Sequence, residues 1–313
     1  MATVCDTEEY ISKILNSRRA GERDVLAFYE HRIGCIGKNP RLMLLPMDDH
    51  LAHRGDGVFE NIKWVNGKLY QLDAHIERMK QSVKGLHLSP PCTWEKLAEL
   101  AVDVARAAET PNGLLRILIG RGPGGFSIDP KECPVSSLYI VAYQLKQKPE
   151  EWFEKGATAF RSSIPAKPSH MARVKSANYI PNVLMKREAD ERGYDFPFSF
   201  DADDFIAEGA TENIALVTQQ GTLLVPEFSN ALVGTTIMRA VELMKDDIKI
   251  EFGPVREDDL YKAKEVLIFG TSSDCVSIVR FEGQPIGDVR PGPVSKEIRR
   301  RLQEDLEANG LPL

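Results

Sequence analysis

The chain has 313 residues, which suits two domains or one large one and is ample to bury a core. Its 42% hydrophobic and 27% charged residues are typical of a soluble globular protein. The net charge of -6 arises from 46 acidic and 40 basic residues, so no basic excess exists to neutralise nucleic-acid phosphates.

The cysteines and the apolar runs indicate the compartment. Five cysteines are an odd number, they are widely spaced and no CxxC occurs, so we expect neither a disulfide framework nor a zinc site. The start, "MATVCDTEEYISK", lacks the apolar core of a signal peptide. The longest apolar runs, "LLRILIG" and "SLYIVAY", are too short to span a bilayer and indicate buried strands. We therefore expect a cytoplasmic protein with no membrane partner.

The first half of the chain predicts a small α+β domain behind a lead-in. Residues 7–31 are charged and weakly amphipathic, which favours a helical lead-in over residues 1–41. From residue 42 the pattern changes: "GVFENIKWVNGKLYQL" alternates and contains Asn66-Gly67, a strong hairpin signal. Helical spacing follows in "DAHIERMKQSVKGL" and in "TWEKLAELAVDVARAAE", which Thr93 can cap. Strands "LLRILIG" and "SSLYIVAYQL" complete this domain, which we place at 42–146.

A polar, proline-containing linker at 147–152 is expected to precede a large domain over 153–313. Three helices are expected there: one from Pro181 to just before Gly193, one after Gly234 and one opening with Pro293. The intervening strands are "ATAFRSS", "FPFSFDADDFIAEG", "NIALVTQQGTLLVP", "KEVLIFG" and "VSIVRFEGQPI".

Two motifs point to chemistry that their surroundings do not support. Gly120, Gly122 and Gly125 of "GRGPGG" match G-x-G-x-x-G, but no helical pattern follows, so a flexible glycine loop beside a pocket is favoured over a dinucleotide site. His50 and His53 of "DDHLAH" could share a helical face, yet no further His or Cys cluster completes a metal shell. A polar turn is the favoured interpretation, with no metal.

Three polar positions could bind an anion or hold a charge. In "NALVGTTIMRAVELMK", Thr235 and Thr236 would lie in a first helical turn, whose N–H groups and dipole suit a phosphate, although a simple threonine cap is the alternative. In "EVLIFGTSSD" a buried strand ends at Gly270 and Thr271 offers a hydroxyl, where a polar turn is the alternative. Glu208 ends an apolar strand and by itself would be a surface carboxylate.

Together these pieces resemble a known family. The order "GDGVFE", "HIERM", "VKSANY", "EGATEN", "GTT", "FGTSS" and "IGDVRPGPVSKEI", over about residues 42–300, is similar to the class IV, fold-type IV pyridoxal-phosphate enzymes. These include branched-chain and D-amino acid aminotransferases, (R)-amine transaminases and aminodeoxychorismate lyase. The resemblance implies an α/β (α+β) two-domain fold of the D-amino acid aminotransferase type. It also implies pyridoxal 5'-phosphate as cofactor, and a homodimer or an assembly of dimers.

The resemblance also implies roles for individual residues. Many relatives read Gly-Ile-Thr-Arg where this chain has Gly234-Thr235-Thr236-Ile237, so the arginine of that loop is missing here. The resemblance implies that Lys175 is the Schiff-base lysine, that Tyr179 binds the cofactor's phenolic oxygen and that Glu208 binds its pyridine nitrogen. It implies that Arg78, Thr236 and Thr271 bind the cofactor's phosphate, with backbone groups of Thr235 and Gly270. Phe59 and Glu60 are implied to line the pocket.

The type of substrate stays open at this point. "EGATEN" is closest to branched-chain aminotransferases, while "RGDGVFE" and "RGPGGFS" lean toward the D-amino acid and lyase branches. Arg54, Arg116 and Arg121 lie in segments that border the substrate pocket in relatives, and each could bind a carboxylate or be a surface arginine.

We expect a transaminase that moves an amino group between a small or hydrophobic amino acid, or an amine, and a 2-keto acid. The alternatives are a lyase of the aminodeoxychorismate type, a D-amino acid or (R)-amine transaminase, and a non-catalytic binding protein on the same fold. The last is disfavoured because Lys175, Arg78 and Glu208 are all present.

Overall fold

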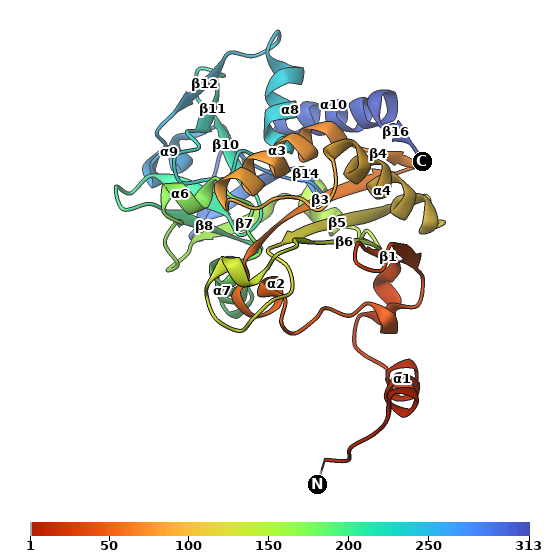
Figure 1. The fold of residues 1–313 in the computed structure, drawn as a ribbon. Helices are drawn as coiled ribbons and strands as arrows, with labels where there is room; N and C mark the ends of the chain where they lie inside the picture. Colours follow the sequence, from red (N-terminus) through yellow and green to blue (C-terminus); the bar gives the residue numbers. More distant parts are fainter. Residues whose placement is uncertain (1) are drawn as a thin grey trace. The chain divides into compact units, whose positions relative to one another are not determined.

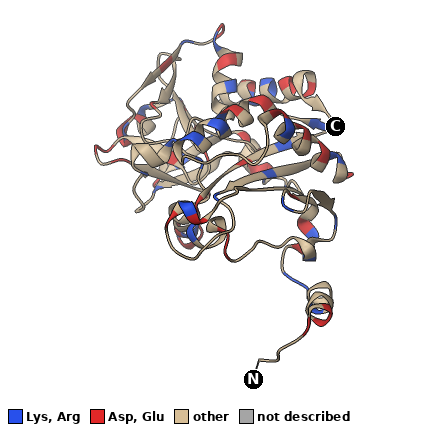
Figure 2. Cartoon of the chain, in the orientation of Figure 1, with Lys and Arg blue, Asp and Glu red and all other residues tan. Residues whose placement is uncertain are grey.

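The computed structural model describes residues 2–313 and divides into two compact units. Unit 1 comprises Met1–Leu145 with Leu311–Leu313, and unit 2 comprises Lys146–Gly310 (Figure 1). Figure 2 shows acidic and basic positions interspersed along the helices within each unit. Among the described residues, no helix has the length and apolar character needed to cross a membrane.

Unit 1 is built on a seven-stranded antiparallel sheet. Asn66 and Gly67 both adopt positive φ (53° and 72°), as a type I′ hairpin requires, so the predicted hairpin is confirmed. The strand order is β16 (Leu311–Pro312), β4 (Lys68–Leu69), β3 (Gly57–Val65), β5 (Gly113–Gly120), β6 (Ser137–Tyr143), β1 (Val25–Glu30) and β2 (Cys35–Gly37).

Two helices pack on one face of this sheet. They are α3 (Leu72–Gly85) and α4 (Trp94–Ala107), both at the predicted places. Thr93 caps α4 by accepting a hydrogen bond from the N–H of Lys96 at 3.2 Å. Because side chains alternate along a strand, every second residue of β3 and β5 is buried beneath these helices, while the residues between them lie on the opposite face.

The expected helical lead-in over 1–41 is wrong beyond its first part. Among the described residues of this segment, only α1 (Thr7–Asn16) is an α-helix. Val25–Glu30 form β1, which pairs with β6 and buries Ala27 and Tyr29, and a short β2 follows. The segment "VLAFYE" is rich in β-branched and aromatic residues, and pairing with β6 satisfies its backbone groups, which outweighs the weak helical pattern.

Unit 2 contains a nine-stranded mixed sheet with a hydrophobic core on each face. Neighbours are antiparallel except at β11–β12, β14–β7 and β7–β8. The order is β12 (Ile250–Gly253), β11 (Leu223–Pro226), β10 (Asn213–Val217), β13 (Glu265–Gly270), β14 (Asp274–Phe281), β7 (Ala157–Arg161), β8 (Phe196–Phe200) and β9 (Ile206–Gly209), and β15 (Gln284–Pro285) pairs with β14.

The three predicted helices of unit 2 are confirmed as α7 (Ile180–Arg192), α8 (Thr235–Met244) and α10 (Pro293–Asn309). α8 and α10 cover one face of the sheet, α10 through Ile298 and Leu302 (Figure 1). The short helices α5 (Glu150–Glu154), α6 (Ser169–Ala172) and α9 (Glu257–Lys262) and the strand β12 were not predicted.

After α10 the chain returns to unit 1, where β16 pairs with β4, and no sequence pattern indicated this. The antiparallel sheet of unit 1 and the mixed sheet of unit 2, each with packed helices, confirm the α/β (α+β) fold class.

Candidate functional site

Lys175 and Tyr179 form the centre of the candidate site in unit 2. Lys175 lies in the loop between α6 and α7, and its neighbours Val174 and Ser176 are buried, which anchors this loop. Tyr179 is the residue before α7. The Lys175 Nζ donates a hydrogen bond to the Tyr179 Oη at 3.3 Å, so the sequence places an amine and a phenol in contact four residues apart.

Glu208 lies on β9, close to the same residues. Its side chain is only 14% exposed, and burial raises the pKa of its carboxyl group, against the attraction of two lysines, Lys167 and Lys175. One carboxylate oxygen, Oε2, accepts a hydrogen bond from the N–H of Leu232 at 3.0 Å. Glu208 is therefore a largely buried carboxylate in a specific orientation, not the surface group that its sequence context alone would suggest.

Lys167 completes this cluster, and the sequence analysis missed it. Its Nζ lies 3.9 Å from the Glu208 Oε1 and 4.8 Å from the centre of the Tyr179 ring. The side chain is 17% exposed, and burial lowers the pKa of its amine. The available signal was a lysine in "PAKP", where Pro165 and Pro168 restrict the backbone on both sides.

The backbone of one residue, Leu232, connects Glu208 to Asn213 just before α8. While the N–H of Leu232 binds Glu208, its carbonyl accepts a hydrogen bond from the Asn213 Nδ2 at 2.7 Å. Asn213, the last residue of "EGATEN", also lies opposite Phe269 in the β10–β13 register. Asn213 therefore ties the loop before α8 to the end of β13.

The residues predicted to bind a phosphate lie at the start of α8 and at the end of β13. Thr235 and Thr236 are buried in the first turn of α8, and its N-cap residue, Gly234, provides no side chain to cap the helix. At the end of β13, Gly270 and Thr271 begin a tight turn, in which the Ser273 N–H donates to the Gly270 carbonyl at 3.1 Å. The N–H groups of a helix start with no capping side chain suit an anion.

Gly234 leads to a testable expectation about this anion site. A Cβ at this position would lie 1.8 Å from the Asn213 Oδ1, so Gly234→Ala must displace Asn213 or the start of α8. We expect the affinity for pyridoxal phosphate to fall about tenfold, the equivalent of a ~1–2 kcal/mol packing strain. Titration of the apoprotein with the cofactor measures this.

The matched control for that change is Gly253→Ala. A Cβ at Gly253 would meet only the Leu224 Cδ1 at 3.7 Å, an ordinary contact. The same glycine-to-alanine change should therefore leave the affinity unaltered. Equal affinities of the two variants would show that the Gly234 segment does not contribute to the cofactor site.

Arg78 is part of a buried ion cluster in unit 1. Its guanidinium donates to both oxygens of Glu60, at 2.8 Å from Nε and 2.6 Å from Nη2. His75 Nδ1 lies 2.7 Å from the Glu60 Oε2. Burial opposes the charge of Glu60, but the ion pair with Arg78 and the two side-chain hydrogen bonds outweigh it and lower the pKa of Glu60 to about 2. Glu60 therefore holds Arg78 beneath α3, while Phe59 points to the opposite face of the sheet.

The three candidate carboxylate-binding arginines differ in what already holds them. Arg121 pairs with both oxygens of Asp56, at 2.9 and 3.1 Å, and also donates to the carbonyls of Leu86 and His87. Arg54 donates to the carbonyl of Phe126 at 2.5 Å.

Arg116 is exposed on β5, where its guanidinium lies over the rings of Phe59 and Tyr143 and donates to the Asn61 Oδ1 at 3.0 Å. These partners are neutral, unlike the carboxylate that holds Arg121.

The segment "GRGPGG" is a loop without a following helix, as its sequence predicted. His50 Nε2 contacts the Gly125 carbonyl at 3.1 Å, and the rings of His50 and His53 pack edge to face at 4.9 Å. Gly122 adopts a φ of 109°, and a Cβ there would lie 1.8 Å from the carbonyl of Val135. The two histidines pack against this loop.

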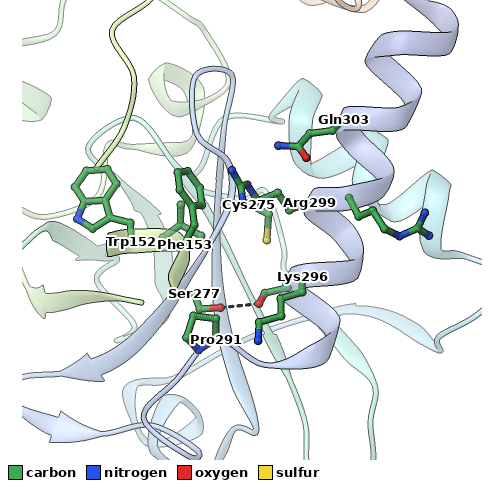
Figure 3. Close-up of a pocket in the computed structure, with 11 residues that line it drawn as sticks. Trp152, Phe153, Cys275, Ser277, Pro291, Lys296, Arg299 and Gln303 are labelled. Atoms are coloured by element: carbon green, nitrogen blue, oxygen red, sulfur yellow. Dashed lines mark hydrogen bonds between the residues drawn. The ribbon is translucent and has the colours of Figure 1, made fainter. Parts of the chain in front are cut away.

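Unit 2 contains a large groove and a smaller cavity. The groove, of about 720 Å³, opens beside Tyr179 and includes Asn182, Thr211 and Glu212 in its lining. The cavity, of about 160 Å³, lies where Trp152 and Phe153 of α5 face Arg299 of α10 (Figure 3). Its lining includes Cys275, and burial raises the pKa of that thiol well above its usual range. None of the residues lining this cavity belongs to the lysine cluster.

Comparison with known proteins gives consistent results. Residues 57–281 match the family model of amino-transferase class IV. The chloroplastic D-amino-acid transaminase of Arabidopsis thaliana is 30% identical over 98% of this chain and 86% of its own length. A putative branched-chain-amino-acid aminotransferase of Methanocaldococcus jannaschii is 29% identical over 82% of this chain and 89% of its own.

Solved structures show the same fold. A branched-chain amino acid aminotransferase from T.th., solved with pyridoxamine 5'-phosphate, superimposes with a TM-score of 0.85 at 25% identity, covering 91% of this chain and 95% of that one. The enzyme of Escherichia coli gives 0.83 at 25% identity, covering 92% and 95%.

Proposed function

The chain belongs to the class IV aminotransferase family, and from this premise we propose that it moves an amino group between a small or hydrophobic amino acid and a 2-keto acid, with Lys175 as its covalent and proton-transferring residue. The arrangement that supports the proposal most directly is the contact of Lys175 with Tyr179 beside the buried Glu208. Pyridoxal 5'-phosphate is the cofactor of this family.

The side chains of unit 2 fit this cofactor. Glu208 offers a buried carboxylate oxygen to the pyridine nitrogen, and Tyr179 offers a hydroxyl to the phenolic oxygen. Lys175 offers an amine to the aldehyde. The start of α8, with no capping side chain, offers N–H groups to the phosphate, together with the hydroxyls of Thr236 and Thr271. In unit 1, Arg78 is the arginine that the family resemblance assigns to a phosphate, and Glu60 fixes its guanidinium through two hydrogen bonds.

Lys175 carries the proton transfer in this proposal. When bound, pyridoxal phosphate supplies an electron sink for the charge left on the substrate α-carbon. The Lys175 Nζ takes the proton from that carbon, while Tyr179 receives the Nζ as a hydrogen-bond donor and so limits its position. Glu208, oriented by the Leu232 N–H, holds a proton at the pyridine nitrogen.

Arg116 is the arginine that we assign to the substrate carboxylate. Asp56 already neutralises Arg121, and Arg54 is bound to a backbone carbonyl. The guanidinium of Arg116 is surrounded by the Asn61 amide oxygen and two aromatic rings, and a planar guanidinium over aromatic rings can still bind a carboxylate through two N–H groups. Phe59 then contributes an apolar wall to the same region.

A D-amino acid is the second candidate for the donor. The D-amino-acid transaminase relative aligns over 98% of this chain, whereas the branched-chain aminotransferase relatives align over 80–82% of it. The motifs "RGDGVFE" and "RGPGGFS" also lean toward the D-amino acid branch, while "EGATEN" favours branched-chain L-amino acids.

The visible spectrum of purified protein tests the proposal. L-leucine, D-alanine and an (R)-amine are added separately to protein loaded with pyridoxal phosphate, without a keto acid. We expect one of the two amino acids to bleach the yellow band near neutral pH, since a half reaction leaves the amino group on the cofactor. The donor that bleaches the band identifies the handedness.

Other outcomes would change the assignment. A yellow band that no donor bleaches, with pyruvate released from an aminodeoxychorismate-type substrate, would indicate the lyase. Absence of any band after loading would contradict the assigned role of Lys175.

We also propose a homodimer and a reducing cytoplasmic location. Ile180 and Val183 at the start of α7 are 67% and 62% exposed, an apolar surface next to Tyr179 that a second subunit could cover. All five cysteines are free thiols, which is compatible with a reducing compartment.

A further inference from the structure

We propose that Lys167 is a positioning residue that keeps Glu208 ionised and the Tyr179 ring in place for the cofactor, an inference that depends on the function proposed above. The alternative is an incidental lysine that happens to point inward. Three features of the structure favour a specific role: the distances from Lys167 to its partners, its restricted backbone and the balance of charges around Glu208.

Lys167 contacts both groups that would hold the cofactor ring. Its Nζ is 3.9 Å from the Glu208 Oε1, the oxygen that does not accept from Leu232, and 4.8 Å from the centre of the Tyr179 ring. Lys175, by comparison, contacts the hydroxyl end of the same ring. Two lysine amines therefore contact the same ring at different positions: Lys175 at its hydroxyl and Lys167 over its face.

The backbone around Lys167 is held firmly. Pro165 and Pro168 flank the segment, and the Ala166 N–H donates to the carbonyl of Phe200 on β8 at 2.9 Å. The side chain extends from this anchored loop toward β9 and is 17% exposed. Keeping a long lysine side chain ordered and largely buried costs conformational entropy and desolvation, so an incidental surface lysine would be expected to stay in water.

The charges around Glu208 make its protonation depend on Lys167. The groups facing this carboxylate are Lys167, Lys175, Glu212 and the Leu232 N–H. Burial raises the pKa of Glu208 and nearby Glu212 raises it further, whereas Lys167, the Leu232 N–H and Lys175 lower it, in that order. Because Lys175 forms the covalent link to the cofactor, its charge changes during the reaction. Lys167 is then the lasting positive partner of Glu208.

The count of protons taken up when cofactor binds tests this role without measuring turnover. The variants are Lys167→Met, which removes the charge at similar length, and Lys167→Arg, which keeps it. Binding of pyridoxal phosphate is followed by calorimetry between pH 6 and pH 8, in buffers that differ in ionisation enthalpy and carry no primary amine. Comparing the two variants cancels the protons that come from the cofactor and from Lys175.

We expect the Lys167→Met protein to take up fewer protons than the Lys167→Arg protein, by up to one per site. Without the positive charge, the pKa of Glu208 is raised further, so more of its carboxyl groups hold a proton before the cofactor binds and fewer protons are taken up on binding. In the Glu208→Gln background this difference should disappear. Lys155→Met removes an exposed lysine paired with Glu151 on α5, and its proton count should equal that of the wild type.

Two results would overturn the role of Lys167 alone: equal proton uptake in the Met and Arg variants at every pH, or a difference that persists in the Glu208→Gln background. Different results would overturn the proposed function itself. One such result is that the wild type does not bind the cofactor. The other is that borohydride fixes the cofactor to the Lys175→Ala protein but not to the Lys167→Met protein, which would make Lys167 the covalent residue.

Discussion

The Lys175→Ala protein is expected to lose its yellow band and to transaminate at least ~10³-fold more slowly than the wild type, while staying folded. The loss is large because one substitution removes both the covalent attachment and the base, and a positioned base alone contributes roughly 10²–10⁴-fold. The fold should persist because the Lys175 side chain lies at the site and not in either hydrophobic core of unit 2. Absorbance, steady-state rates and thermal unfolding measure the three properties.

Two further measurements separate chemistry from structure in this variant. A small amine such as methylamine should restore part of the rate, since it can occupy the space left by the lysine side chain and accept the substrate proton. Lys155→Ala, at an exposed lysine on the same unit, should keep both band and rate. Unimpaired turnover by the Lys175→Ala protein would refute the assignment of this residue.

The elements that carry the site were largely predictable because their signals are local. The turn Asn66-Gly67, the cap at Thr93, Pro181 with Gly193 around α7 and the glycine before α8 all depend on residues adjacent in sequence. Backbone preferences and capping act over a few residues, so a pattern in the sequence suffices to locate them.

The lead-in shows where this reasoning fails. Val25–Glu30 form a strand because they pair with β6, which lies more than a hundred residues later in the chain. No sequence pattern near Val25 predicts this pairing. The same applies to β16, whose two residues pair with β4 after the longest helix of unit 2 has ended. Pairing across such a separation decides the structure of weakly patterned segments.

The site residues divide in the same way. Lys175, Tyr179 and Glu208 could be named because they lie in motifs that resemble a family. Lys167 and Leu232 could not be named from the sequence. Lys167 lies on a separate loop and acts through its Nζ, 3.9 Å from the Glu208 Oε1. Leu232 acts through its backbone N–H, which every residue except proline has, so its side-chain type gives no signal. The sequence placed Glu60 in the pocket beside Phe59, whereas alternation along β3 turns it toward Arg78 and His75.

Glu60→Gln is expected to produce a large loss of stability in unit 1. The side chain of Glu60 is 1% exposed, and its ion pair with Arg78 and hydrogen bonds to Arg78 and His75 hold its pKa at about 2, well below the usual 4.5. That shift corresponds to about 3 kcal/mol of folding free energy near neutral pH. Removing one partner of a buried pair costs a similar ~3–5 kcal/mol, because the Arg78 charge stays behind.

The pH dependence of unfolding distinguishes this explanation from simple loss of packing. A carboxyl group whose pKa is lowered by folding stabilises the folded state fully above pH 4.5, and this contribution disappears as the pH falls toward 2. Wild-type stability should therefore decline through that window. The Glu60→Gln protein should start lower and decline less. Denaturant unfolding of the apoproteins at pH 7, 5, 4 and 3 measures both curves.

Glu297 provides the matched control, because ion pairs also lower its pKa to about 2. Its partners are Arg300 and Arg301 on the surface of α10, and its side chain is 33% exposed. Solvent screens such pairs, so Glu297→Gln should change stability far less than Glu60→Gln despite the same direction of shift. Equal effects of the two substitutions would mean that burial of the Glu60–Arg78 pair adds nothing. Arg78 would then need another explanation for its position beneath α3.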